Sequence, residues 1–141
     1  VSIHVRRGDY LEPKYWKTTG CVCQLPYYLN AIAEMNKRIS QPSYYVFSDD
    51  IAWVKENLPL PKVFFIDWNK GTESWQDMML MSRCRHHIIC NSTFSWWGAW
   101  LNPRENKTVI MPERWFRHCE TPDICPDKWI KVPINQPDSI Q

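Results

Sequence analysis

The feature that most constrains the fold is a regular alternation of short apolar runs with longer amphipathic stretches. The runs are rich in β-branched and aromatic residues, have the usual strand length of about five residues, and cover 1–5, 44–47, 63–66, 87–90 and 108–111. Stretches with helical spacing lie at 26–39, 50–58, 74–83 and 95–101. Because apolar strands joined by helices favour a buried parallel sheet, we predict an α/β fold, a Rossmann-like parallel sheet with helices on both faces.

Residues with strong backbone preferences stand where these helices should begin and end. Pro26 fits the first turn of its helix, and Asp50 and Ser74 fit N-cap positions. Pro59 and Pro103 fit helix stops. These positions support the helix assignments independently of the apolar pattern.

Length and composition allow one domain with a sizeable hydrophobic core. We assign this domain to residues 1–132 and expect irregular, proline-rich structure after residue 112 and a loosely ordered tail over 133–141. The chain lacks an initiator Met and opens inside a predicted strand, so we expect that the natural protein continues upstream.

The charge pattern argues against nucleic acid as a partner. The formal net charge is +2, and acidic and basic residues are interspersed, so no basic stripe is available for phosphate backbones. No run approaches the ~20 apolar residues that cross a bilayer, and no signal segment is visible. We therefore expect a cytoplasmic protein, with the inner face of a membrane as the alternative location.

The six cysteines do not form the paired spacing that is typical of zinc sites. Cys84 and Cys90 lie in apolar stretches and are predicted to be small buried hydrophobes. Cys119 and Cys125 flank a proline-containing loop and could close it, but a reduced state is our expectation.

Polar residues follow four of the predicted strands. Because the carboxyl ends of parallel strands meet at one edge of the sheet, these residues should converge on a ligand site. They are Arg6, Arg7 and Asp9 after the first strand, Ser48, Asp49 and Asp50 after the second, Asp67 and Asn69 after the third, and Asn91, Ser92, Thr93 and Ser95 after the fourth.

The two arginines after the first strand suggest what the ligand carries. Planar guanidinium groups match phosphate oxygens, and Gly8 lets the backbone turn or approach a ligand closely. The alternative is that Arg6 and Arg7 form ion pairs with Asp49 or Asp50.

The fourth polar cluster passes directly into a predicted helix. Free N–H groups and the positive end of the helix dipole make such a turn a phosphate cradle, whereas the alternative is ordinary N-capping by Thr93 or Ser95. The glycine-rich dinucleotide fingerprint and the P-loop are both absent. The tryptophans of this helix, Trp96, Trp97 and Trp100, are predicted to be core, with sugar stacking as the alternative.

Three segments resemble the sequence motifs of the α-1,2-fucosyltransferases, glycosyltransferase family eleven. They are 4–9 (HVRRGD), 47–50 (FSDD) and 77–100 (DMMLMSRCRHHIICNSTFSWWGAW). The resemblance implies that the chain is the C-terminal, GDP-fucose-binding half of a GT-B type enzyme whose N-terminal acceptor domain is absent. It also implies inverting, metal-independent transfer of L-fucose from GDP-β-L-fucose to the 2-hydroxyl of a terminal galactoside.

The resemblance implies roles for individual residues. Arg6 would hold the β-phosphate, His4 and Asp77 would help to place the guanosine, and the turn over 92–95 would contact the diphosphate. The candidate catalytic residues are Arg6, Asp9 and Glu12, where the two acids are candidate bases for the acceptor proton. The candidate substrate-binding residues are His4, Arg7, Ser48, Asp49, Asp50, Asp77, Asn91, Ser92, Thr93, Phe94 and Ser95.

We expect neither a metal nor a cofactor, because the adjacent pair Asp49 and Asp50 has no obvious third ligand. The expected partners are a GDP-fucose donor, a galactoside acceptor and, through the absent half, a membrane surface. The isolated fragment should be inactive. The alternative function is a non-catalytic nucleotide-sugar or carbohydrate-binding module.

Overall fold

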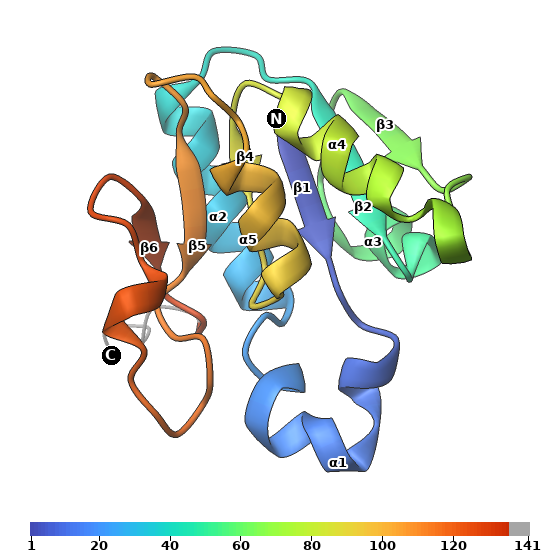
Figure 1. The fold of residues 1–141 in the computed structure, drawn as a ribbon, viewed down its shortest axis with the longest axis vertical. Coiled ribbons are helices and arrows are strands. Elements are labelled where there is room, and N and C mark those ends of the chain that lie inside the picture. Colours follow the sequence, from blue (N-terminus) through green and yellow to red (C-terminus); the bar gives the residue numbers. More distant parts are fainter. Residues whose placement is uncertain (136–141) are drawn as a thin grey trace.

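The computed structural model describes residues 1–135, which form a six-stranded parallel sheet (Figure 1). The strand order is β3-β2-β1-β4-β5-β6, so β1 lies at the centre between β2 and β4. This architecture confirms the predicted Rossmann-like α/β fold. The strands are β1 Ser2–Val5, β2 Tyr44–Ser48, β3 Val63–Ile66, β4 His87–Ile88, β5 Val109–Pro112 and β6 Ile130–Val132.

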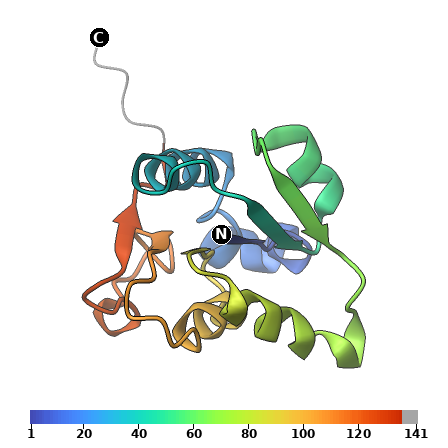
Figure 2. The same cartoon turned by 90° about the horizontal axis from the view of Figure 1, so that it is seen from above.

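Helices cover both faces of the sheet (Figure 2). Side chains alternate along each strand, so Val46 joins the core beneath the first two long helices, whereas Phe47 packs with Met81 on the opposite face. The helices α2 Leu25–Arg38 and α3 Ile51–Asn57 cover one face, and α4 Trp75–Arg83 and α5 Thr93–Trp100 cover the other.

A helical excursion connects β1 to α2 and projects beyond the carboxyl edge of the sheet (Figure 1). It contains η1 Asp9–Leu11, α1 Pro13–Tyr15 and the π-helical turn η2 Trp16–Gly20. The Tyr10 hydroxyl donates a 2.9 Å hydrogen bond to the Asn91 carbonyl, and Asn91 Nδ2 donates a 3.0 Å bond to the Thr19 carbonyl. The sequence analysis did not predict this excursion, because its short turns carry no helical or strand period. Two further 3-10 turns are η3 Gly71–Glu73 and η4 Pro122–Ile124.

The largest error in the predicted elements lies after residue 112. That segment is not wholly irregular, because β6 pairs with β5 and places Ile130 beside Ile110. A three-residue strand is too short to show a period, and the ladder of β5 supplies the partner that fixes it. At the helix starts, Asp50 caps α3 as predicted by accepting a 3.1 Å hydrogen bond from the Trp53 N–H, whereas Ser74 stands at the N-cap of α4 without a side-chain bond.

The tryptophans of α5 differ from the prediction that all three are core. Trp97 and Trp100 are 47% and 49% exposed, and only Trp96 is half-buried, with its ring 5.4 Å from that of Trp129. The prediction from the apolar pattern was wrong for Trp97 and Trp100 because α5 carries apolar side chains on its outer side as well as its inner side.

The cysteines are free thiols, and Cys119 and Cys125 do not close their loop. Cys90 is buried as predicted, whereas Cys84 is only half-buried. Its position just after the last turn of α4 leaves it at the edge of the core rather than inside it.

The end of the described chain is tied to α2. Asn30 Nδ2 donates 3.0 Å hydrogen bonds to the carbonyls of Pro133 and Asn135. The remainder of the predicted tail, residues 136–141, lies outside the described residues. Within residues 1–135, no helix has the length and apolar character that a membrane crossing requires.

A buried polar network joins the central strands beneath α5. Asn102 accepts a 3.1 Å hydrogen bond from the Arg104 N–H and donates a 2.9 Å bond to the Cys84 carbonyl, which fixes the orientation of its amide. The same amide nitrogen lies 2.8 Å from His87 Nε2, so Nε2 is an acceptor and Nδ1–H donates to Ser2 Oγ at 2.7 Å. The network therefore selects a neutral His87.

We expect the free energy of unfolding to fall as the pH drops below about 6.5. Burial, reinforced by Lys107, lowers the pKa of His87 to about 3, and burial and then Arg6 lower the pKa of His4 to about 3. The unfolded chain binds these protons near pH 6.5 and the folded chain does not, so each histidine removes about 1.4 kcal/mol of stability per pH unit between those values. Urea unfolding at several pH values measures this slope.

The variant His87→Gln should reduce the pH dependence of the free energy of unfolding by the contribution of one histidine, about 1.4 kcal/mol per pH unit. Replacement of the exposed His118 by Gln is the matched control and should leave the slope unchanged. A wild-type stability that stays constant from pH 7 to pH 5 would contradict the prediction.

Candidate functional site

A cavity of about 630 Å³ opens at the carboxyl edge of the sheet, beside the ends of β1, β2 and β3. This edge is where parallel α/β sheets bind ligands, and it is where the polar residues after the strands were predicted to meet. The side chains that give the cavity its chemical character are His4, Arg6, Asp49, Lys70, Asp77 and Phe94.

The polar contacts of Arg6 are made through its Nε, and its guanidinium carbon lies 5.8 Å from the centre of the Tyr10 ring. Its Nε donates a 2.9 Å hydrogen bond to Asp9 Oδ1 and lies 3.6 Å from Asp49 Oδ2. In the described part of the chain, no acceptor is hydrogen-bonded to the two terminal nitrogens of Arg6, which belongs to the cavity lining. A guanidinium with its two terminal nitrogens uncommitted can bind two oxygens of an anion at once.

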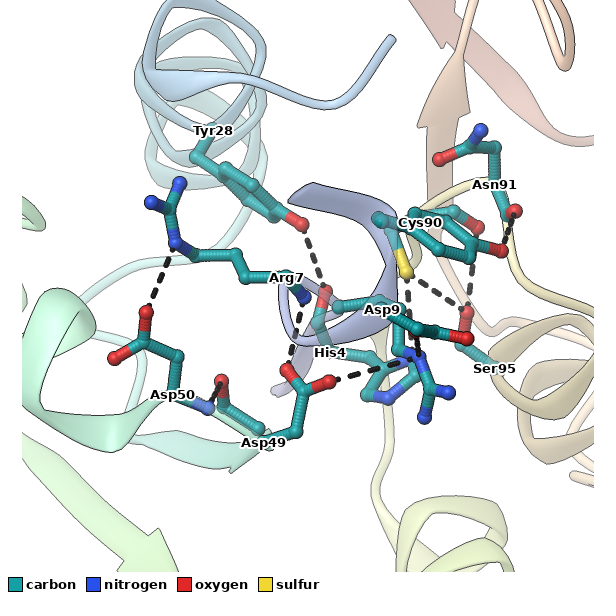
Figure 3. Close-up of polar contacts among 12 residues, drawn as sticks. His4, Arg7, Asp9, Tyr28, Asp49, Asp50, Cys90, Asn91 and Ser95 are labelled. Carbon is teal, nitrogen blue, oxygen red and sulfur yellow. Dashed lines mark hydrogen bonds and ion pairs between the residues drawn. The ribbon is translucent and has the colours of Figure 1, made fainter. Parts of the chain in front are cut away.

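Arg7 is directed away from the cavity, toward α3 (Figure 3). Its Nε lies 3.1 Å from Asp50 Oδ2, its guanidinium lies 4.1 Å from the centre of the Trp53 ring, and the side chain is only 14% exposed. The predicted alternative of ion pairs with Asp49 or Asp50 therefore describes Arg7 fully, while Arg6 also lies within ion-pair distance of Asp49. Arg7 connects β1 to α3.

The second polar cluster is used mainly inside the protein. The Ser48 hydroxyl accepts a 2.9 Å hydrogen bond from the Asp50 N–H, and Asp50 caps α3 and pairs with Arg7. Ser48 and Asp49 line the cavity, whereas Asp50 does not.

Asp77 faces the cavity from the first turn of α4. Asn69 Nδ2 donates a 2.7 Å hydrogen bond to its Oδ1. Burial raises the pKa of Asp77, and the Asn69 bond opposes that shift. Asn69 lines the cavity, in agreement with the prediction that polar residues after the third strand converge there, although no role was assigned to it. Lys70 also lines the cavity and was not predicted, and its position just after the same strand was the signal that could have identified it.

His4 forms the inner wall of the cavity and is 6% exposed. Its Nδ1 lies 3.3 Å from the Cys90 thiol, and its ring lies 5.6 Å from that of Phe94. Burial raises the pKa of Cys90 to about 11, so the thiol is protonated beside a neutral imidazole. His4 and Phe94 therefore give this wall of the cavity an uncharged, aromatic surface, and Cys90 lies buried behind His4.

The fourth polar cluster serves the fold rather than the cavity, which contains only its Phe94. Ser92 is the N-cap of α5, and it makes no capping bond with its side chain, so the predicted caps Thr93 and Ser95 are wrong. Ser95 is fully buried and donates to the carbonyls of Cys90 and Ser92. Asn91 Nδ2 donates 3.0 Å bonds to the carbonyls of Thr19 and Trp115, and Thr93 is exposed outside the cavity.

The two candidate bases lie on the excursion and do not line the cavity. Asp9 is paired with Arg6, whose hydrogen bond lowers the pKa of Asp9. Glu12 lies 3.4 Å from Lys14 Nζ and is 52% exposed. Over residues 1–135, no group of three or more His, Cys, Asp or Glu side chains is arranged to hold a metal ion.

A second cavity, of about 680 Å³, is lined by residues just before β1, β2 and β4, such as Val1, Ser43 and His86, and also by Phe47 and Ile66 near the carboxyl ends of β2 and β3. Its lining includes the apolar side chains of Tyr45, Ile66 and Leu80. Arg83 and Arg85 also line it, but it contains no carboxylate. The cavity at the carboxyl edge combines opposite charges with hydrogen-bonding groups and is the better candidate site.

The fold and this cavity define a Rossmann-like domain with a cavity of mixed charge at the carboxyl edge of its sheet. Comparison with protein families is in agreement. Residues 1–132 match the glycosyl transferase family 11 model, and the chain belongs to this family. The family predicted from the three motifs is thereby confirmed.

Similar proteins come from bacteria and primates. The chain is 38% identical over 136 residues to an alpha-1,2-colitosyltransferase of Escherichia coli, which covers 94% of the chain and 47% of that protein. It is 37% identical over 133 residues to the O-antigen biosynthesis glycosyltransferase WbnK of Escherichia coli, covering 94% of the chain and 44% of that protein. A galactoside alpha-(1,2)-fucosyltransferase 1 of Saimiri boliviensis boliviensis is 35% identical over 105 residues, which are 72% of the chain and 28% of that protein.

The chain thus spans less than half the length of these relatives. No solved structure gives a significant match.

Proposed function

We propose that the chain is the donor-binding half of an inverting α-1,2-glycosyltransferase that moves L-fucose from GDP-β-L-fucose to the 2-hydroxyl of a terminal galactoside. The observation that carries the proposal is Arg6, whose terminal nitrogens are uncommitted at a cavity that also contains Asp77. Family membership and the α-1,2 linkage named for two of the relatives support the same conclusion.

The chemistry explains why a fixed arginine is needed. Cleavage of a glycosyl phosphate bond passes through an oxocarbenium-like state while negative charge grows on the departing diphosphate. Arg6 would stabilise this charge, and each charge-assisted hydrogen bond contributes about 1.5–3 kcal/mol. Lys70, which also lines the cavity, would add a second cation.

The acceptor hydroxyl must lose a proton, and Asp9 and Glu12 remain the proposed bases. Asp9 is engaged by Arg6, which lowers its pKa and makes it a weak base. Glu12 is the better candidate of the two because its carboxylate is exposed and contacts only the flexible Lys14 side chain.

A colitosyl donor is the second candidate, because an alpha-1,2-colitosyltransferase is among the relatives, at 38% identity. Calorimetry of the full-length protein with GDP, GDP-fucose, a colitosyl nucleotide, GDP-mannose and UDP-galactose tests the nucleotide and the sugar. Preference for a colitosyl nucleotide over GDP-fucose would change the sugar, and tight binding of UDP-galactose alone would overturn the donor assignment.

A non-catalytic nucleotide-sugar or carbohydrate-binding module is the alternative of a different class. Turnover of GDP-fucose on lactose by the full-length protein separates an enzyme from a binding module. We place the protein in the cytoplasm, which fits its six free thiols, and any membrane attachment in the half that lies outside this chain.

Activity of the full-length protein should persist in EDTA. The charge of the leaving group is met by Arg6 in this proposal, and adjacent Asp49 and Asp50 are both engaged by arginines. Turnover is measured with and without chelator, and a Mn²⁺ add-back serves as the control. Loss of activity that Mn²⁺ restores would make the two aspartates metal ligands instead.

A further inference from the structure

Asp49 connects the end of β2 to both arginines that follow β1 (Figure 3). Its Oδ1 accepts a 2.8 Å hydrogen bond from the Arg7 backbone N–H, and its Oδ2 lies 3.6 Å from Arg6 Nε. Although Asp49 belongs to the cavity lining, both of its oxygens are already engaged by the chain. Turning the carboxylate toward a ligand would leave the Arg7 N–H without its acceptor.

Gly8 leaves the space that this carboxylate occupies. A Cβ on Gly8 would lie 2.6 Å from Asp49 Oδ2 and 3.3 Å from Asp49 Cγ, and the first distance is too short for real atoms. The φ of Gly8 is −20°, outside the left-handed region, so space rather than backbone handedness requires a glycine. The Asp49 side chain, which follows β2, thus explains why a glycine follows the two arginines.

Asp9 holds the same nitrogen of Arg6 as Asp49 does. The two carboxylates lie 2.9 and 3.6 Å from Nε, and both leave the terminal nitrogens available to a ligand. We propose that Asp49 is a positioning residue, which fixes the direction of the Arg6 guanidinium instead of binding the ligand. The inference rests on the proposed function, because it gives Asp49 its role through the phosphate contact of Arg6.

The direction in which one substitution changes GDP affinity distinguishes a positioning role of Asp49 from a purely electrostatic one. A carboxylate close to a bound diphosphate repels it, so loss of the Asp49 charge alone would tighten GDP binding. Loss of the contact that directs Arg6 would weaken GDP binding instead. The two roles predict opposite changes.

The test uses Asp49→Asn in the full-length protein, with GDP binding measured by calorimetry. The amide oxygen can still accept from the Arg7 N–H, so the urea midpoint of unfolding should stay nearly unchanged. GDP affinity should fall about threefold to tenfold, a coupling typical of residues in contact. In the Arg6→Ala background the same substitution should change the affinity by less than about twofold, because no guanidinium remains to be directed.

A second double-mutant cycle, measured in the absence of nucleotide, tests the packing of Asp49 against Gly8. Gly8→Ala should lower the urea midpoint in the wild type and lower it much less in an Asp49→Ala background, where no carboxylate occupies the space. Asp127→Asn, an exposed carboxylate substitution, is the matched control and should change neither the midpoint nor GDP affinity.

Three results would overturn the positioning role: tighter GDP binding by Asp49→Asn, an equal loss in the Arg6→Ala background, or additive effects of Gly8 and Asp49. Each leaves the proposed function intact provided that Arg6→Ala alone weakens GDP binding. If Arg6→Ala has no effect on GDP binding, the proposed function fails and the positioning role fails with it.

Discussion

Replacing Arg6 with Ala in the full-length protein is expected to lower turnover by roughly tenfold to a thousandfold. The contact strengthens as charge develops on the leaving diphosphate, so the loss should appear in kcat as well as in donor affinity. Stability should change little, because the pairs of Arg6 with Asp9 and Asp49 are solvent-exposed and such pairs contribute about 0–1 kcal/mol. Initial rates with GDP-fucose and a galactoside measure the effect.

Arg6→Lys should also be poor, since an ammonium group cannot reproduce two parallel hydrogen bonds. Arg38→Ala is the matched control, because Arg38 forms an exposed ion pair with Glu34 on α2 and does not line the cavity. Near-normal turnover of a folded Arg6→Ala protein would show that the phosphate assignment is incorrect.

Replacing Asp77 with Asn is expected to weaken GDP binding at least about tenfold, a loss of roughly 1.4 kcal/mol. Asn69 already donates to Asp77 Oδ1, which leaves the second oxygen as the acceptor available to a ligand. In the variant, Asn69 can still donate to the amide oxygen, and the amide NH₂ then takes the place of that acceptor. A guanine N1–H and exocyclic amine would face a donor, and unpaired groups in a desolvated site are costly.

General electrostatics predicts the opposite result, because removing a negative charge favours an anionic ligand. Asp67→Asn provides the control, since Asp67 lines the same cavity and carries the same charge. It should leave GDP affinity unchanged or slightly higher. An Asp77→Asn protein that binds GDP as tightly as the wild type would leave Asp77 only its interaction with the dipole of α4, worth ~0.3–1 kcal/mol.

The meeting of three strand ends at one cavity could be predicted because it follows from one topological rule. Carboxyl ends of parallel strands meet at one edge, so Arg6, Asp49 and Asn69 converge although they follow three different strands. The rule concerns the course of the backbone, and the alternation of apolar runs and amphipathic stretches predicts the order of strands and helices along it.

Side-chain direction could not be predicted in the same way. Arg6 and Arg7 are adjacent and chemically equal, but Asp50 and Trp53 on the following helix draw Arg7 away from the cavity. The hydroxyl of Ser95 is suited to a phosphate, but it is buried and satisfies backbone carbonyls instead. These choices depend on distant partners, and local sequence does not contain them.

The central position of β1 has a consequence for how the chain reaches its native state. Ser2 pairs on one side with Tyr45 and on the other with His87, which lies 85 residues further along the chain. During synthesis, one edge of the first strand stays unpaired until β4 has emerged, and contacts of such sequence separation form slowly. An open strand edge invites pairing with other chains. While the segment between β3 and β4 is translated, one edge of β1 therefore remains open to such pairing.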